Sequence, residues 1–194
     1  MKLSAIFICG PSGTGKTTLS KALVRLLVAD GHPVCLLDKD SVTDALSHAF
    51  MHELTGNAAD RDSPAYKEKV RDQEYQCTLE AARDNLELGI SCVMPAPWTQ
   101  ELADGRLQNP YLFGDPDGAR VVIVWLTLDS TERRRRIAER GFYRDRYKLE
   151  HWERFSDASA PPKHENVIVL DAARPTDELA LSLRARLLAK ITPT

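Results

Sequence analysis

The sequence lacks the features that mark several specialised protein classes. Only four of its 194 residues are cysteine, three of them in apolar runs where cysteine acts as a small hydrophobe, and no CxxC pair occurs. Neither a zinc site nor a disulfide framework is therefore expected. No apolar run approaches the roughly 18 residues of a membrane span. The run Leu3–Cys9 lacks a signal-peptide cleavage site and leads into a glycine-rich loop, so we expect a first β-strand and a cytoplasmic protein.

The chain also has no excess of charge of one sign. Its 26 lysines and arginines are balanced by 28 aspartates and glutamates, which gives a net charge of -2. Nucleic acid is therefore not the expected partner, since nucleic-acid-binding domains are commonly basic. The length is that of one domain with a small lid, and no repeat, low-complexity tract or linker divides it. We expect a single domain over residues 1–194.

Short apolar runs alternate with helical patterns along the chain. The runs do not alternate with polar residues, which is typical of a parallel sheet covered on both faces. Apolar residues at helical spacing lie between them, and strands that alternate with helices predict an α/β fold. The five predicted strands are Leu3–Cys9, Val34–Leu37, Ser91–Met94, Val121–Leu126 and Val167–Leu170, and the predicted helices include Leu19–Leu27, Tyr66–Leu88 and Leu179–Leu187.

Two stretches fit neither pattern. Thr55–Pro64 and Pro95–Gly118 read as irregular, and long loops in compact α/β domains are usually functional. We expect the second stretch to cover the substrate side of the site. Acceptor specificity is expected in the first stretch, at Trp98 and in the loop to Phe113.

The segment Gly10–Thr17, GPSGTGKT, matches the pattern GxxxxGK[ST] between an apolar strand and an amphipathic helix. Its glycines let backbone N–H groups cradle phosphate oxygens at the positive end of a helix. Lys16 is expected to bridge the β- and γ-phosphates, and the Thr17 hydroxyl to ligate Mg²⁺. A plain glycine turn would not require both of these residues. We predict that ATP with Mg²⁺ is bound by Gly10, Ser12, Gly13, Thr14, Gly15, Lys16, Thr17 and Thr18.

Two carboxylates, Asp38 and Asp40, follow the second predicted strand. The carboxyl ends of strands in an open α/β sheet face the ligand crevice. At least one of the two is therefore expected to face the transferring phosphate. The alternative is that Asp40 only caps a helix that begins at Ser41.

A basic run, Arg133–Arg136, continues into further arginines at Arg140 and Arg144. Arg136 and Arg140 share one helical face at i, i+4 spacing. Arginines in a movable segment suit phosphoryl transfer, where charge on the migrating group is stabilised and water excluded. We expect Arg136, Arg140 and Arg144 to overhang the glycine-rich loop, with residues 133–135 partly turned outward as a solvated face.

Together these motifs resemble the P-loop small-molecule kinases related to chloramphenicol phosphotransferase, zeta toxins and polynucleotide kinase. The resemblance covers most of the chain, through GPSGTGKTT, LLDKDSV and LTLDSTERRRRIAERGFYRD in this order. It implies a three-layer P-loop NTPase fold with a five-stranded parallel sheet of order 2-3-1-4-5, helices on both faces and a small helical lid at about residues 130–156. It also implies an ATP-dependent kinase that phosphorylates a hydroxyl of a small molecule.

The resemblance assigns roles to individual residues. Asp40 would orient or deprotonate the acceptor hydroxyl, although Asp38 stays open as the base. Arg136, Arg140 and Arg144 would act in catalysis together with Lys16. The turn at residues 171–175, which includes Arg174, would lie near the adenine.

Two positions depart from the family pattern. Pro95 follows the third strand where relatives often carry an aspartate of the Mg²⁺ shell, which shifts the metal to Thr17 and Asp38. Thr43 stands where many relatives have an arginine, which weakens the analogy with polynucleotide kinases. A polynucleotide 5′-hydroxyl kinase and a regulatory ATPase without an acceptor remain the alternatives. The acceptor and the oligomeric state are left open.

Overall fold

The computed structural model describes residues 1–114, 118–156 and 166–189. Its five strands pair in parallel in the order β2-β3-β1-β4-β5, which confirms the predicted α/β fold and strand order. The strands are β1 (Ser4–Cys9), β2 (Val34–Leu36), β3 (Ser91–Pro95), β4 (Arg120–Thr127) and β5 (Val167–Asp171).

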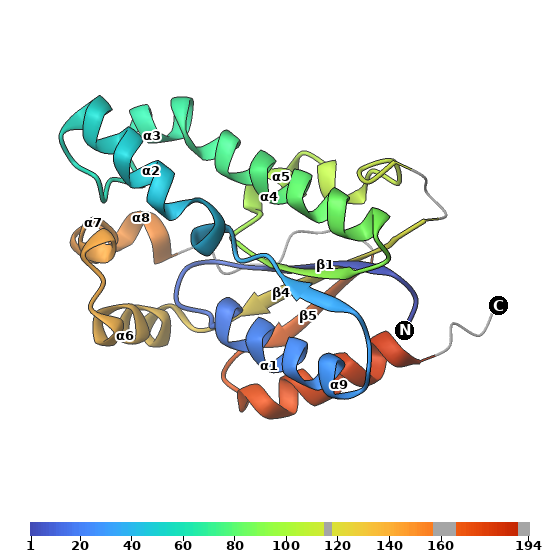
Figure 1. Ribbon diagram of the computed structural model, residues 1–194. Coiled ribbons are helices and arrows are strands. Elements are labelled where there is room, and N and C mark those ends of the chain that lie inside the picture. The colour runs from blue at the N-terminus through green and yellow to red at the C-terminus, as the bar shows by residue number, and fades with distance from the viewer. Residues whose placement is uncertain (115–117, 157–165, 190–194) are drawn as a thin grey trace.

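Helices cover both faces of this sheet (Figure 1). Helices α1 and α9 lie on one face, and α4 and α5 lie on the other. The described helices are α1 (Lys16–Ala29), α2 (Lys39–Thr55), α3 (Pro64–Lys69), α4 (Arg71–Glu87), α5 (Thr99–Ala103), α6 (Ser130–Arg140), α7 (Arg146–Glu150), α8 (Glu153–Ser156) and α9 (Thr176–Leu188), with 3-10 turns η1 (Arg106–Gln108) and η2 (Tyr143–Asp145).

The central strand β1 is buried on both sides, and its side chains alternate between two cores. Ile6 and Ile8 pack with the leucines of α1 and α9. Phe7 and Cys9 pack with residues of α4 and with Trp98. This arrangement explains why the run is apolar at every position, since neither face of the strand meets water.

Three expectations about local structure are wrong. The predicted helix from Tyr66 is two helices, α3 and α4, which are separated at Val70 with φ -120° and ψ -43°. The stretch read as irregular from Pro95 contains α5 and η1, and residues 115–117 of it lie outside the described chain. Trp98, where acceptor specificity was expected, is 0% exposed, so its side chain has no surface with which to contact an acceptor. Its ring packs edge-on against Phe7 at 5.0 Å, and its indole N–H donates to the Met94 carbonyl at 2.9 Å.

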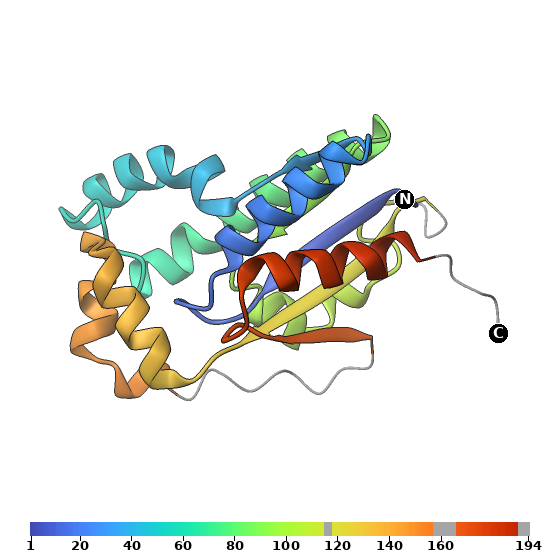
Figure 2. The same cartoon turned by 90° about the horizontal axis from the view of Figure 1, so that it is seen from below.

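The remaining helices lie beyond the carboxyl ends of the strands (Figures 1 and 2). Helices α2 and α3 lie on one side of the loop that joins β1 to α1, and α6, α7 and α8 lie on the other. Within the described residues no helix is long and apolar enough to cross a membrane. The end of the sheet at which the sequence motifs gather is therefore enclosed by two helical segments.

Candidate active site

The loop between β1 and α1 has the backbone of a phosphate cradle. Gly10, Gly13 and Gly15 have positive φ angles of 130°, 86° and 86°. A Cβ on Gly10 would lie 2.7 Å from the Leu126 carbonyl oxygen, and a Cβ on Gly13 would meet the backbone of α6 at 2.8 Å. Only glycine tolerates both these angles and this crowding. The loop delivers the chain to the N-terminus of α1, whose free N–H groups attract anions.

Lys16 reaches back over this loop. Its Nζ donates hydrogen bonds of 2.8 Å to the carbonyl oxygens of Gly10 and Pro11. Burial lowers the pKa of Lys16 to about 8, while nearby carboxylates such as Asp40 act in the opposite direction. Thr14 is buried and donates to the Pro11 carbonyl at 2.9 Å, so its hydroxyl serves the loop itself. The ammonium thus lies inside the cradle in which a phosphate would bind.

Thr17 and Asp38 are in direct contact, as expected of residues that share one ion. The Thr17 hydroxyl donates to Asp38 Oδ2 at 2.8 Å. Asp38 Oδ1 accepts from the Asp40 backbone N–H at 3.1 Å, so Asp38 is the N-cap of α2 and the helix begins at Lys39. The alternative in which Asp40 caps a helix from Ser41 is therefore wrong. The cap leaves the Asp40 side chain free for other contacts.

Asp40 is held between two cations from distant parts of the chain. Lys39 Nζ lies 3.0 Å from Asp40 Oδ1, and an Arg144 guanidinium nitrogen lies 2.9 Å from Asp40 Oδ2. Arg144 also binds Asp44 at 3.0 Å. Burial acts to raise the pKa of Asp40, but the charges of Lys39 and Arg144 outweigh it and hold this pKa below its ordinary value of 3.8.

The other predicted arginines approach the site from α6. Arg136 lies beside the glycine-rich loop, with a guanidinium nitrogen 3.9 Å from the Cβ position of Gly15. It is held by Glu132 at 2.8 Å and by the Ala172 carbonyl at 3.3 Å. Arg140 makes a bidentate ion pair with the buried Asp145, at 2.6 and 2.7 Å. Carboxylate partners therefore fix these side chains before any ligand binds.

Arg133 contradicts the expectation that residues 133–135 form a solvated face. It is 1% exposed and donates to the carbonyl oxygens of Phe155 and Ser156 at 3.0 and 2.7 Å. Its guanidinium also lies over the Trp152 ring. Arg133 thus ties α6 to α8, whereas Arg134 and Arg135 are exposed as expected. Three adjacent arginines point to different sides because successive helix residues are about 100° apart.

Arg174 is the one predicted site residue that lies apart from the others. Its side chain is 54% exposed, and its guanidinium pairs with Glu178 in the first turn of α9 at 3.3 Å. It does not line the cleft that holds Lys16, the two aspartates and the other predicted arginines. The described structure brings the remaining charged site residues together and leaves this one on the surface.

A buried charged network next to Asp40 escaped the sequence analysis. Glu74, on α4, is 2% exposed and accepts hydrogen bonds from Lys39 Nζ and from the Tyr66 hydroxyl at 2.7 Å. The Arg61 Nε lies 3.7 Å from its second oxygen. These four residues, the Glu74 cluster, connect three helical segments behind the Asp40 carboxylate. In the sequence, Glu74 and Lys39 are single charged residues within amphipathic helical patterns. Such patterns do not show that two residues 35 positions apart form an ion pair.

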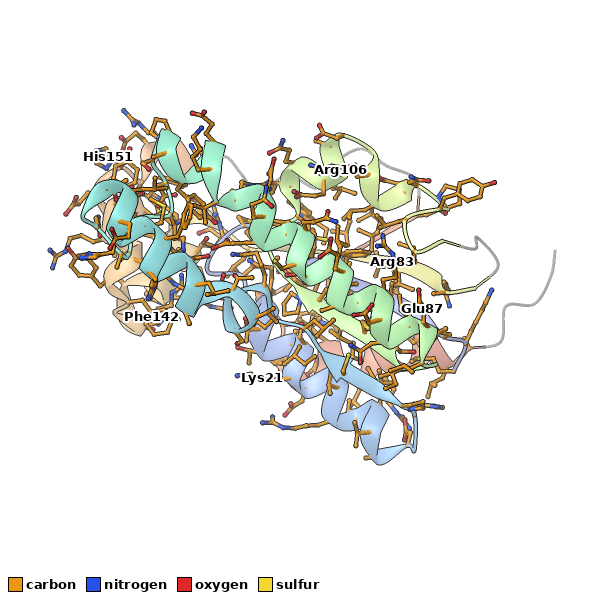
Figure 3. All side chains as sticks on the ribbon, turned by 45° about the horizontal axis from the view of Figure 1, so that its top comes forward. Lys21, Arg83, Glu87, Arg106, Phe142 and His151 are labelled. Carbon is orange, nitrogen blue, oxygen red and sulfur yellow. The ribbon has the colours of Figure 1, made fainter. Side chains whose placement is uncertain are left out.

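One cleft of about 1350 Å³ unites these parts. It contains the glycine-rich loop, the start of α2, the segment around α3, residues 95–97 and the helices α6 to α8. Ten lysines and arginines but only five aspartates, and no glutamate, line it. The side chains that line the cleft therefore carry an excess of positive charge, part of which is offset by glutamates behind the lining such as Glu74 and Glu132, although the whole chain carries a net charge of -2. In Figure 3, Phe142 lies in the turn after α6, at the end of the molecule that holds this cleft.

A polyanion is the ligand that this charge distribution favours, because field lines concentrate in a cleft lined by one sign of charge. At the end of β3 the lining residues are Pro95, Ala96 and Pro97, so this strand contributes no carboxylate. Thr43, the second departure from the family pattern, is buried and donates to the Lys39 carbonyl at 2.8 Å. It serves the helix rather than the cleft.

Known proteins share both the sequence pattern and this fold. The family model described as AAA domain matches residues 6–162. The adenylyl-sulfate kinase of Deinococcus deserti is 33% identical over 105 residues, which make up 54% of this chain and 52% of that protein. The chain thus spans about half the length of this curated relative.

Two solved structures are similar over nearly their whole length. The putative kinase of Chloroflexus aurantiacus J-10-fl has a TM-score of 0.64 and 20% identity, covering 95% of this chain and 98% of the other. The APS kinase of Mycobacterium tuberculosis in complex with AMPPNP and APS has a TM-score of 0.66 and 18% identity, covering 97% and 99%. At this identity the likeness is one of fold. With a family model that matches most of its length, the chain belongs to the AAA domain family of P-loop NTPases and has the fold of P-loop kinases.

Proposed function

We propose that this protein is a kinase that transfers the γ-phosphate of Mg-ATP to a hydroxyl of a small molecule. The observation that carries the proposal is the ion pair between Asp40 and Arg144 inside the cleft that also holds Lys16. It joins an acid in the first turn of α2 to an arginine 104 positions later, next to a phosphate cradle. A module that only binds nucleotide has no need of this constellation. The kinase names of the relatives support the same conclusion.

Lys16 and the backbone N–H groups of residues 10–17 would bind the triphosphate. Their geometry is suited to this task because the ammonium already lies within the loop, bonded to carbonyl oxygens that a phosphate oxygen would outcompete. Ser12 and Thr18 also line the cleft beside the loop. Arg136, next to Gly15, would add positive charge on the outer side of the phosphates.

Thr17 and Asp38 would hold the magnesium ion. Their oxygens are hard donors 2.8 Å apart at the edge of the cradle, and Mg²⁺ is commonly bound by one or two such side chains together with phosphate oxygens and waters. The described residues contain no group of three or more acidic, histidine or cysteine side chains that could enclose a metal, which fits an ion that is mainly held by its nucleotide. When bound, Mg²⁺ neutralises charge on the β- and γ-phosphates.

Asp40 would orient the acceptor hydroxyl rather than act as a strong base. Its low pKa keeps it ionised and gives it little affinity for a proton. Phosphoryl transfer passes through a loose transition state, so an ionised carboxylate that aligns the hydroxyl supplies most of what is needed. Lys39, which is paired with Glu74, would fix the Asp40 side chain in place.

Residues 130–156 would act as the lid. They form α6 to α8, supply Arg133, Arg136, Arg140 and Arg144 to the cleft, and lie across it from α2. Arg144 reaches Asp40 and Asp44 of α2, so the two sides of the cleft are already joined by ion pairs. A substrate that enters would have to displace these contacts, and Arg144 would then be free to face the γ-phosphate.

The test is a transfer assay with γ-labelled ATP and a panel of hydroxyl compounds, beginning with adenylyl sulfate, the substrate in the name of a relative. The expected result is label in an organic product, abolished by Lys16→Ala and slowed about 10²–10⁴-fold by Asp40→Asn. The matched control is Asp104→Asn, which removes a 52% exposed aspartate outside the cleft. Label that appears only as inorganic phosphate, with a rate that depends on Lys16 and not on Asp40, would instead identify a regulatory ATPase.

A further inference from the structure

Cys35 and Cys92 face one another across two parallel strands. They are register partners of β2 and β3, and their Sγ atoms lie 3.5 Å apart. Neighbouring strands run about 4.7–4.9 Å apart. That spacing falls within the Cα separations of ~4.4–6.8 Å that a disulfide accepts. Bond formation would require the sulfurs to approach by about 1.5 Å, since a disulfide is ~2.05 Å long.

The two thiols differ in access. Cys92 is fully buried, and its sulfur also lies 3.6 Å from the carbonyl oxygens of Ala82 and Ile90. Cys35 is half-buried on β2, the three-residue strand at the edge of the sheet. A short edge strand is held from one side only and can shift more easily than a central one. An oxidant would therefore reach Cys35 first, with Cys92 behind it as the second thiol.

We propose that Cys35 and Cys92 form a modification site at which hydrogen peroxide closes an intrachain disulfide. In the first step the Cys35 sulfur attacks the O–O bond, becomes a sulfenic acid and releases one water. In the second step the Cys92 sulfur attacks the Cys35 sulfur, forms the S–S bond and releases a second water. Two thiols are oxidised by two electrons in all, and one hydrogen peroxide is reduced to two waters.

The bond would act on the end of the sheet that carries the site. Cys35 lies three residues before Asp38, and Cys92 lies three residues before Pro95. Closing the long loop between the two cysteines also removes conformational freedom from the unfolded chain. The oxidised protein is therefore more stable than the reduced one, and the stability gain disappears on reduction. This proposal does not depend on the proposed kinase activity.

The experiment uses the whole chain with Cys77→Ser, because Cys77 is exposed on α4 and could join two molecules. The native protein is treated with hydrogen peroxide, its remaining thiols are alkylated, and intact mass and peptide maps are recorded. The expected result is the loss of two hydrogen atoms, a peptide pair that joins Cys35 to Cys92, and a higher Tm that dithiothreitol reverses.

Two variants of this background identify each step. Cys92→Ser should stop at a Cys35 sulfenic acid that dimedone traps, and Cys35→Ser should lose no hydrogen atoms. If the Cys92→Ser variant does not fold because Cys92 is buried, Cys35→Ser still tests the proposal, since Cys35 is only half-buried. Each of three results would overturn the proposal. Both Cys35 and Cys92 could be found alkylated after the peroxide treatment, Cys35 could be oxidised beyond the sulfenic acid without a link to Cys92, or the disulfide could involve Cys9.

Discussion

Replacing Glu74 by glutamine tests whether the buried charged network supports the active site. Glu74 is 2% exposed, and Lys39, its main partner, is 4% exposed. The substitution keeps the shape of the side chain and removes its charge. The Lys39 ammonium would keep one carboxylate neighbour, Asp40, at 3.0 Å. The Tyr66 hydroxyl would lose a charged acceptor at 2.7 Å.

The expected loss of stability follows from this geometry. Breaking a buried ion pair by removing one charge costs about 3–5 kcal/mol, because the other charge stays in a poorly solvated place. Asp40 still compensates part of the Lys39 charge, so the expected loss in free energy of unfolding is near the lower limit, about 3 kcal/mol. Lys39 would also turn more strongly toward Asp40 and disturb its orientation, so kcat should fall while KM for ATP changes little.

Urea unfolding and steady-state turnover measure the two effects. Glu87→Gln is the matched control, since Glu87 is exposed at the end of the same helix (Figure 3). Burial acts to raise the pKa of Glu74, but the Lys39 charge and hydrogen bonds lower it overall. The stability from ionised Glu74 is therefore complete above its ordinary pKa of 4.5 and declines as the pH falls below it. A Glu74→Gln variant would refute this reasoning if it had wild-type stability and if its free energy of unfolding fell at acid pH in the same way as that of the wild type.

Three further predictions concern the cleft itself. Asp40→Asn should retain Mg-ATP affinity, measured by calorimetry, and lower kcat by about 10²–10⁴-fold; a parallel loss of affinity at limiting metal would make Asp40 a metal ligand instead. Arg140→Ala and Arg144→Ala should lower kcat by up to about 10³–10⁵-fold, because these two arginines would stabilise charge in the transition state. Arg134→Ala, which removes an exposed arginine of the same helical segment, should change kcat little. Equal effects of the three substitutions on kcat would exclude a lid role. Nucleotide affinity should weaken as the pH rises through about 8, because Lys16 loses its charge above its pKa; a flat titration to pH 9.5 would contradict this.

Much of the fold and of the nucleotide site could be predicted from the sequence because both depend on local patterns. Gly10, Gly13 and Gly15 are required by backbone angles at those positions, and Lys16 follows at a fixed distance along the chain. The all-apolar β1 run predicted a strand buried on both faces, which the two cores confirm. The role of each site residue in catalysis stays a prediction.

Side-chain direction on a helix was harder to predict. Arg133 and Arg134 are adjacent and chemically identical, yet Arg133 is buried against the Trp152 ring and Arg134 is exposed. Helical periodicity says which residues share a face, but not which face a neighbouring helix covers. The assignment of the helix cap had the same difficulty, since Asp38 and Asp40 are both plausible caps by residue type.

The sequence by itself thus determined the phosphate-binding loop, the alternation of strands and helices, and the presence of acids and arginines near one end of the sheet. Only the tertiary structure decided which of these meet. Glu74 contacts Lys39, which is 35 positions away in the sequence. Arg144 contacts Asp44 over 100 positions, and Cys35 contacts Cys92 over 57 positions. A phosphate-binding loop is encoded by neighbours along the chain, because it is a backbone conformation. Contacts between distant residues depend on strand order and on how helices pack, and these are properties of the whole chain.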